Sequence, residues 1–151
     1  MECLNYSKAG STEDIKNEID RMVREEKLSL KQAECIKLKD IDTFAGSSIG
    51  ERIKRAYAYG WVKREQPFVF EYDRQLVQGV IDLYFIEDGQ LVIVDYKTDR
   101  VLRGRAGEDE LRRRYSIQID YYAMALSQIT GLKVKEKVIY SFALGRSLTV
   151  E

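Results

Sequence analysis

The sequence of 151 residues contains no histidine. This absence excludes nucleophilic catalysis of the Ser/His/Asp and Cys/His kinds, because both need an imidazole as the base. Acid–base chemistry in this chain would therefore use carboxylates, lysine or metal-bound water. The two cysteines, Cys3 and Cys35, have no CxxC spacing and no histidine to complete a zinc site, so we expect free thiols in a reducing compartment.

Long apolar runs are also absent. No stretch approaches the roughly 20 consecutive apolar residues of a membrane-spanning helix, and the first residues lack the basic and then apolar order of a signal peptide. We therefore expect a cytoplasmic protein. The composition, 44% hydrophobic and 33% charged, is that of a folded chain, and the length predicts a single domain over 1–151.

The chain has no net charge, so it lacks the overall basic signature of a nucleic-acid-binding protein. Residues 100–115 nevertheless hold six arginines against Glu108, Asp109 and Glu110. A local basic excess fits contact with a polyanion at one place, while a solvated arginine-rich loop explains the same residues.

The N-terminal part, 1–60, is predicted to be helical. A first helix begins at Ser11 or Thr12 and carries apolar residues at helical spacing. A second, short helix begins at Ser29. A third begins at Ser47 or Ser48 and stops at Gly60. The apolar residues that carry the first two helices are Ile15, Ile19, Met22 and Val23, then Leu30, Ala33 and Leu38.

The middle of the chain predicts strands. An apolar run at 68–72 follows Pro67, the single proline, and 76–85 alternates between two faces. An Asp-Gly turn joins that strand to 91–97, which is the strongest short signal for a hairpin. Residues 68–97 are therefore predicted to form a three-stranded antiparallel meander.

The remainder predicts a long helix over 109–130, ended by Gly131, and a closing strand over 134–143. The fold class is then α/β, a mixed central β-sheet of the meander and the later strand, flanked by helices and preceded by a helical segment. The core of the domain is expected to span 61–151.

The strand LVIVDYK at 91–97 opens with apolar residues yet ends with Asp95 and Lys97, two positions apart and so on one face. Asp82 lies on the preceding strand and can approach Asp95 across the ladder. Two carboxylates can hold Mg²⁺, which polarises a phosphate and acidifies a bound water, and Lys97 can orient that water or offset developing charge. The competing interpretation is a structural Asp–Lys ion pair.

Three motifs occur in the order GVID at 79–82, DYKT at 95–98 and QIDYY at 118–122. They resemble the GxxD, DYKT and QxxxY series of RecB-like nucleases of the PD-(D/E)XK superfamily. The runs REQPF at 64–68, VDYKTDRV at 94–101 and YSFALGRSLTV at 140–150 are similar to the nuclease domain of AddA-type helicase-nucleases. The similarity spans nearly the whole chain, and the ordered set is more specific than any one motif.

The resemblance implies a restriction-endonuclease-like core and Mg²⁺- or Mn²⁺-dependent exonuclease chemistry on DNA, in double-strand break repair and recombination. It implies metal ligands at Asp82, Asp95 and the carbonyl of Tyr96, with Lys97 as the catalytic lysine. The implied partners are single-stranded or unwound DNA, helicase domains of the same polypeptide and an AddB-like subunit, in a cytoplasmic, nucleoid-associated setting.

Other residues keep two interpretations. Glu65 holds the family's upstream glutamate position and supports metal or water, or pairs with Arg64 or a basic-loop arginine. Gln118 and Tyr122 share one helical face and bond the site or the DNA backbone, or they pack the helix on the sheet. The DNA contacts expected in the basic loop are Arg100, Arg103 and Arg105.

One departure from the family pattern bears on activity. Family members carry an upstream histidine, in a GTxxH-like motif, that supplies a further metal ligand, and this chain has none. Its opening, MECLNYSKAGSTEDIKNEI, resembles the segment just downstream of that motif. We therefore expect a fragment of a larger helicase-nuclease. The alternatives are a crippled module that docks DNA or a partner, and a purely structural interaction domain.

Overall fold

The computed structural model describes residues 12–26, 29, 33 and 37–151. The chain divides into two compact units, Met1–Tyr59 and Gly60–Glu151, and each is described by itself. The single domain expected over 1–151 stays a prediction. None of the helices among the described residues is long and apolar enough to cross a membrane.

In the first unit, the described helices are α1 (Thr12–Arg24), α3 (Leu38–Ala45) and α4 (Ser48–Ala58). α1 bears out the first predicted helix, although Ser11 lies outside the described residues. Ser47 caps α4, since its side chain accepts a hydrogen bond from the Gly50 amide at 3.2 Å. α4 ends just before Gly60, as predicted.

The second predicted helix falls mostly outside the described residues. Leu38 was expected near its end but instead begins α3, a helix that the sequence analysis did not predict. The apolar spacing of Ile41, Phe44 and Ala45, all buried, is the signal that would have indicated it.

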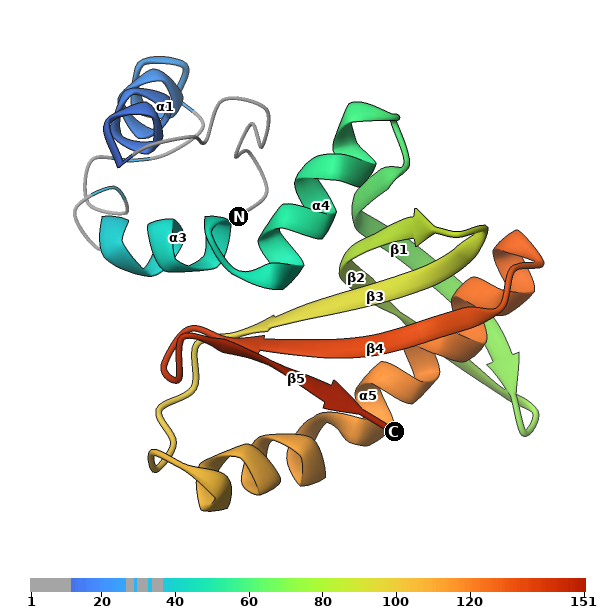
Figure 1. The fold of residues 1–151 in the computed structure, drawn as a ribbon. Helices are drawn as coiled ribbons and strands as arrows, with labels where there is room; N and C mark the ends of the chain where they lie inside the picture. The colour runs from blue at the N-terminus through green and yellow to red at the C-terminus, as the bar shows by residue number, and fades with distance from the viewer. Residues whose placement is uncertain (1–11, 27–28, 30–32, 34–36) are drawn as a thin grey trace. The chain divides into compact units, whose positions relative to one another are not determined.

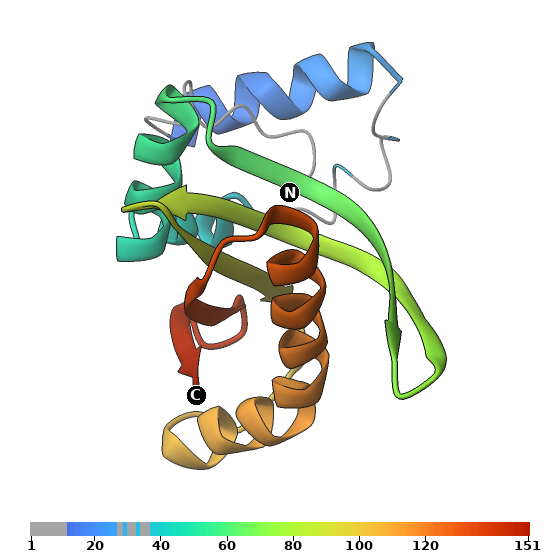
Figure 2. The same ribbon diagram turned by 90° about the vertical axis from the view of Figure 1, so that its right-hand side faces the viewer.

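The second unit contains one five-stranded sheet in the order β1-β2-β3-β4-β5 (Figure 1). The strands are β1 (Val62–Tyr72), β2 (Gln75–Glu87), β3 (Gln90–Lys97), β4 (Val134–Ser141) and β5 (Arg146–Val150). β3 and β4 are parallel and the other neighbouring pairs are antiparallel, which confirms the predicted mixed sheet. The parallel pair is joined through α5 (Arg105–Thr130), which packs across one face of the sheet (Figures 1 and 2).

The meander predicted at 68–97 is confirmed, and its second turn is the expected one. Asp88 and Gly89 both have positive φ, 53° and 73°, and Glu87 pairs with Gln90, the geometry that favours Asp-Gly in two-residue hairpins. The start of the first strand was predicted too late. Pro67 lies inside β1, where it is tolerated because β1 is the edge strand of the sheet.

Two further boundaries differ from the prediction. The chain turns at Gly145, φ 65°, into β5, which pairs with β4 and was not expected. α5 begins at Arg105 rather than at 109, because Gly107 forms part of its first turns. A Cβ on Gly107 would lie 1.9 Å from the Leu102 carbonyl oxygen, so this glycine lets the helix meet the preceding loop. The other end is as predicted, with Gly131 in the left-handed conformation at φ 72°.

One hydrophobic core lies between the sheet and α5. Leu111, Ile119 and Leu126 of the helix are fully buried in it, against Ile93 of β3 and Ile139 of β4. At the far end of the helix, the Phe68 and Tyr122 rings meet edge to face with centroids 5.6 Å apart. These contacts fix α5 over the sheet that includes β3, the strand that carries both Asp95 and Lys97.

Candidate active site

The site is built where β2 and β3 separate. Leu83 and Val94 are the last paired residues of these strands at this end, so the next positions in register are Asp82 and Asp95. Asp82 turns its Oδ2 onto the backbone of the neighbouring strand and accepts a hydrogen bond of 2.8 Å from the Tyr96 amide. The Asp82 carboxylate therefore replaces the next backbone hydrogen bond between β2 and β3. The structure places Asp82 beside Asp95, as the predicted hairpin required.

Asp95 is the buried charge of the site, with 2% of its side chain exposed. Its Oδ2 lies 2.8 Å from Nζ of Lys97, the same-face contact that the sequence predicted. The geometry of that contact is ionic, and Oδ2 has no hydrogen-bond partner among the described residues. Burying a carboxylate is costly unless cations compensate for the lost water, and Lys97 is one such cation.

Burial raises the pKa of the Asp95 carboxyl to about 6. The Lys97 ammonium opposes this effect, while the negative charges of Asp82 and Asp99 add to it. Burial therefore disfavours the charged form of this carboxyl, a pattern that is common at functional sites.

Lys97 is held by α5 as well as by Asp95. Its Nζ donates to Oε1 of Gln118 at 3.1 Å and lies 4.2 Å from the centroid of the Tyr115 ring. Nε2 of Gln118 in turn donates to the Tyr122 hydroxyl at 2.6 Å. Gln118 therefore contacts Lys97 directly, whereas Tyr122 contacts Gln118 and packs against Phe68.

The negative charge of Asp95 also affects the pKa of Tyr122 on α5. Burial, followed by the charge of Asp95, raises the pKa of the Tyr122 hydroxyl to about 12. The hydroxyl therefore stays protonated and able to donate a hydrogen bond at any physiological pH.

Asp99 anchors the segment that follows β3. Its Oδ1 accepts hydrogen bonds from the Tyr115 hydroxyl at 2.8 Å and from Nη1 of Arg114 at 3.0 Å. The Tyr115 bond is the largest of the causes that lower the pKa of the Asp99 carboxyl. No role was predicted for Asp99, Arg114 or Tyr115 in the site. The sequence indicates only their positions: Asp99 lies two residues after Lys97, and Arg114 and Tyr115 lie about one helical turn before Gln118.

Glu65 lies opposite Asp82 on β1, because Arg64 pairs with Leu83 and Gln66 with Ile81. Its backbone has φ 47°, the left-handed region that a residue with a bulky side chain seldom adopts. Its side chain is exposed. No group of three potential metal-binding side chains occurs among the residues that the structure describes, so Glu65 is not gathered with the two aspartates.

The predicted basic loop is exposed at Arg100, Arg103 and Arg105. Its neighbours on α5 are largely engaged with carboxylates: Arg112 approaches Glu108 and Asp109, and Arg114 approaches Asp99 and Glu110. Arg103 also lines a pocket of about 380 Å³ with Arg146, which itself pairs with Glu108 at 2.9 Å. Arg146 was not predicted, because it reaches this surface from β5.

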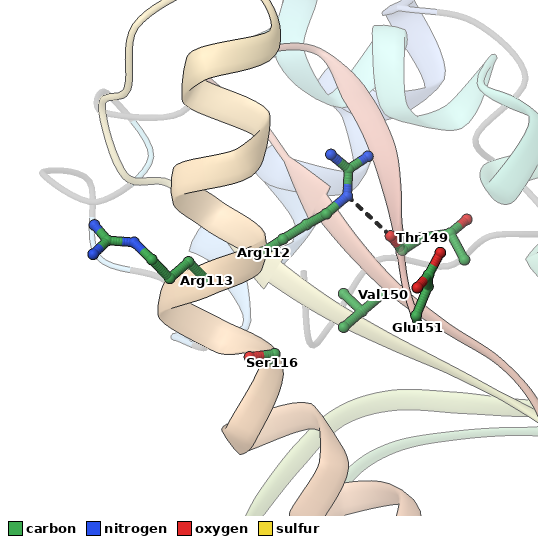
Figure 3. Close-up of a pocket in the computed structure, with 6 residues that line it drawn as sticks. All are labelled: Arg112, Arg113, Ser116, Thr149, Val150 and Glu151. Atoms are coloured by element: carbon green, nitrogen blue, oxygen red, sulfur yellow. Dashed lines mark hydrogen bonds between the residues drawn. The ribbon is translucent and has the colours of Figure 1, made fainter.

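A second pocket, of about 550 Å³, opens between α5 and the end of β5 (Figure 3). Arg112 reaches across it and donates from Nε to the Thr149 carbonyl oxygen at 3.1 Å, whereas Arg113 points to the other side of the helix (Figure 3). None of the residues that line this pocket is Asp82, Asp95 or Lys97. This pocket is therefore separate from the candidate active site.

The carboxylates of Asp82 and Asp95 suit a hard divalent cation that needs few ligands from the protein. Mg²⁺ takes one or two carboxylates and keeps several waters or phosphate oxygens as its other ligands, so Asp82 and Asp95 satisfy what it requires of a protein. The observation that supports this fit is the closeness of two carboxylates, Asp82 and the buried Asp95, beside the single ammonium group of Lys97. A zinc-type site is not indicated, since the sequence has no histidine and Asp95 brings an oxygen donor.

Comparison with known proteins agrees with this chemistry. The family described as the PD-(D/E)XK nuclease superfamily matches residues 4–148, and the chain belongs to that superfamily. Within it, the chain matches the nuclease region of AddA, an ATP-dependent helicase/nuclease, at 34–40% identity.

Three AddA relatives show the extent of the match. The chain is 40% identical over 163 residues to the protein of Thermoanaerobacter sp. strain X514, covering 98% of the chain and 13% of the relative. It is 35% identical over 158 residues to that of Clostridium novyi, covering 94% and 12%. It is 34% identical over 167 residues to that of Clostridium botulinum strain Langeland, covering 100% and 12%. The chain thus spans about an eighth of the length of these relatives.

Proposed function

We propose that this chain hydrolyses DNA phosphodiester bonds with Mg²⁺ or Mn²⁺, as the exonuclease domain of an ATP-dependent helicase-nuclease in double-strand break repair and recombination. The observation that carries the proposal is Asp95, a buried carboxylate that lies next to Asp82 in register and 2.8 Å from Nζ of Lys97. Membership of the nuclease superfamily supports the reaction class.

In this proposal, Asp82, Asp95 and the Tyr96 carbonyl hold the cation. Glu65, which is exposed on β1 opposite Asp82, would have to turn toward the aspartates to support the metal or its water. The bound cation would supply Lewis-acid polarisation of the phosphate and a water of lowered pKa. Asp82 and Asp95 orient that centre from two adjacent strands. Lys97, the catalytic residue, directs its ammonium toward the attacking water or the charge that develops on the phosphate.

DNA would reach this centre past the basic loop, with Arg100, Arg103 and Arg105 contacting backbone phosphates. Gln118 and Tyr122 keep the lysine oriented from the helix. The helicase domains of the same polypeptide and an AddB-like subunit would deliver the unwound strand, in the cytoplasm at the nucleoid. The support for these partners is the similarity to AddA proteins, which are helicase/nucleases.

Cleavage of 5′-labelled single-stranded DNA, titrated with Mg²⁺ and Mn²⁺, tests the proposal in the parent chain and in Asp95→Ala. Asp73→Asn, an exposed carboxylate in the β1–β2 turn, is the matched control. We expect metal-dependent cleavage by the parent and by the control, and loss of at least about a hundredfold in Asp95→Ala. Equal cleavage by all three proteins would exclude Asp95 from the chemistry.

A second candidate function is a non-catalytic module that docks DNA or a partner protein. Two observations favour it: the sequence has no histidine, and no group of three metal-binding side chains occurs in the described part of the chain. If this is correct, joining the family's upstream histidine segment to the chain raises Mn²⁺ affinity and cleavage substantially. Unchanged affinity and cleavage after joining would count against it.

A further inference from the structure

The face of the Tyr115 ring is turned toward the ammonium group of Lys97, with 4.2 Å between Nζ and the ring centroid. Tyr115 lies on α5, one turn before Gln118, so both residues approach Lys97 from the same side of the helix. An ammonium above an aromatic face is attracted by the negative potential of the ring, and the attraction grows as water is removed. Only 14% of the Lys97 side chain is exposed.

The ring itself is held from the strand side. The Tyr115 hydroxyl donates to Oδ1 of Asp99, and Nη1 of Arg114 donates to the same oxygen. Lys97 and Asp99 belong to one short segment at the end of β3. Tyr115 therefore touches that segment at two points, its ring at Lys97 and its hydroxyl at Asp99.

Three neighbouring groups lie around the ammonium group in the described part of the chain. Nζ has three N–H donors. Asp95 lies 2.8 Å from Nζ, Gln118 accepts at 3.1 Å, and the centroid of the Tyr115 ring lies 4.2 Å away. A carboxylate that shares its charge with a metal attracts an ammonium less strongly, so Gln118 and Tyr115 are the partners that keep Lys97 in place when Asp95 serves the cation.

We propose that Tyr115 is a positioning residue that holds the Lys97 ammonium through the face of its ring. The proposal rests on the proposed nuclease function for its consequence in catalysis, but not for the ring contact itself. The ring is the operative group, and the hydroxyl serves to hold the ring.

The first test does not depend on activity. In the folded parent chain, the ring current of Tyr115 shifts the ε-methylene protons of Lys97 upfield from their exposed-lysine position, measured by NMR after Lys97→Arg identifies the resonance. Tyr115→Phe retains this shift, because the ring remains. Tyr115→Met, which keeps a long apolar side chain on the helix, loses it. An unshifted Lys97 signal in the folded parent would overturn the proposal, whatever the variants do.

The second test uses cleavage of single-stranded DNA at saturating Mn²⁺. Tyr115→Met lowers kcat by about tenfold, with KM for DNA and the half-saturating Mn²⁺ concentration unchanged, and Tyr115→Phe stays within about threefold of the parent. An equal loss of kcat in both variants, or a rise in KM alone, would overturn the ring's role. A parent that shows the NMR shift but no cleavage would refute the proposed function and leave the positioning contact established.

Discussion

The backbone amide of Tyr96 donates a 2.8 Å hydrogen bond to Oδ2 of Asp82, so a side chain of β2 pairs with the backbone of β3 where the ladder ends. Asp82 thereby has a structural duty in addition to any role in binding a cation. The two duties respond differently to substitution, because one needs an acceptor atom and the other needs a charge.

Asp82→Asn is expected to keep the fold and lose the charge. Its amide oxygen still accepts from Tyr96, so the free energy of unfolding in urea changes little, whereas Mn²⁺ affinity measured by calorimetry falls by at least about tenfold. Asp82→Ala loses the acceptor as well and unfolds with about 1 to 2 kcal/mol less free energy. If Asn destabilised the chain as much as Ala, the hydrogen bond would not be the structural contribution of Asp82.

The buried carboxyl of Asp95 predicts a specific dependence of stability on pH. Its pKa is about 6 in the folded chain and near 3.8 when exposed. Between these values the folded state binds more protons than the unfolded state, so the contribution of Asp95 to stability falls as pH rises from 4 to 6, and is constant above about 7. The total loss is roughly 3 kcal/mol.

The measurement is the free energy of unfolding from pH 4 to 8, for the parent minus Asp95→Asn, which subtracts the other titrating groups. The difference should decline between pH 4 and 6. A difference that rises with pH for Asp95 would mean that its carboxylate is stabilised in the fold rather than penalised.

Gly107→Ala is expected to destabilise the Gly60–Glu151 unit by about 1 to 3 kcal/mol. The added Cβ would lie 1.9 Å from the Leu102 carbonyl oxygen, so either the loop or the first turns of α5 must move. Ala106→Ser, at the exposed neighbouring position of the same turn, is the control and should be nearly neutral. Thermal unfolding by circular dichroism compares the two, and matching transition temperatures would show that the contact is relaxed at no cost.

Arg100→Ala with Arg103→Ala is expected to weaken single-stranded DNA binding several-fold and to lower the slope of log affinity against log salt by about 1.4, as for two lost phosphate contacts. Lys135→Ala is the control, because this lysine is engaged with Glu87 and Asp88 at the start of β4. Fluorescence anisotropy at several salt concentrations measures both. A slope unchanged in the double variant would remove the loop from the DNA path.

The parts of the fold that the sequence predicted are those with a local cause. The Asp-Gly turn, the Gly131 helix end and the same-face spacing of Asp95 and Lys97 each follow from a few neighbouring residues. Asp82 could be assigned to the same site, because a short turn makes its strand, β2, the neighbour of β3. Two members of the candidate site, Asp95 and Lys97, were thus within reach from spacing alone.

The features that escaped prediction depend on packing between distant segments. From the sequence, Gly107 is typical of a loop, and its close approach to Leu102 is visible only in the structure. In the same way, Tyr115 is one apolar position in a helical stripe, and only the structure shows its ring against Lys97. The left-handed backbone of Glu65 has no sequence signal, since glutamate does not favour it. β5 is different: Gly145 between two apolar runs was a hairpin signal, and it was overlooked.

The parallel pairing of β3 with β4 has a consequence for how the site is assembled during folding. The antiparallel meander closes through short turns, whereas Asp95 pairs with Ile139 only after the chain has run the length of α5 and returned. Pairings between such distant positions form slowly, because the entropy of closing the long loop is lost before the contacts form. We therefore expect Asp82 and Asp95 to meet early, when the β2–β3 hairpin forms. Gln118 and Tyr115 of α5 would reach Lys97 only in the last step. A folding intermediate that stalled before this step would expose the two aspartates without the contacts of α5 to Lys97.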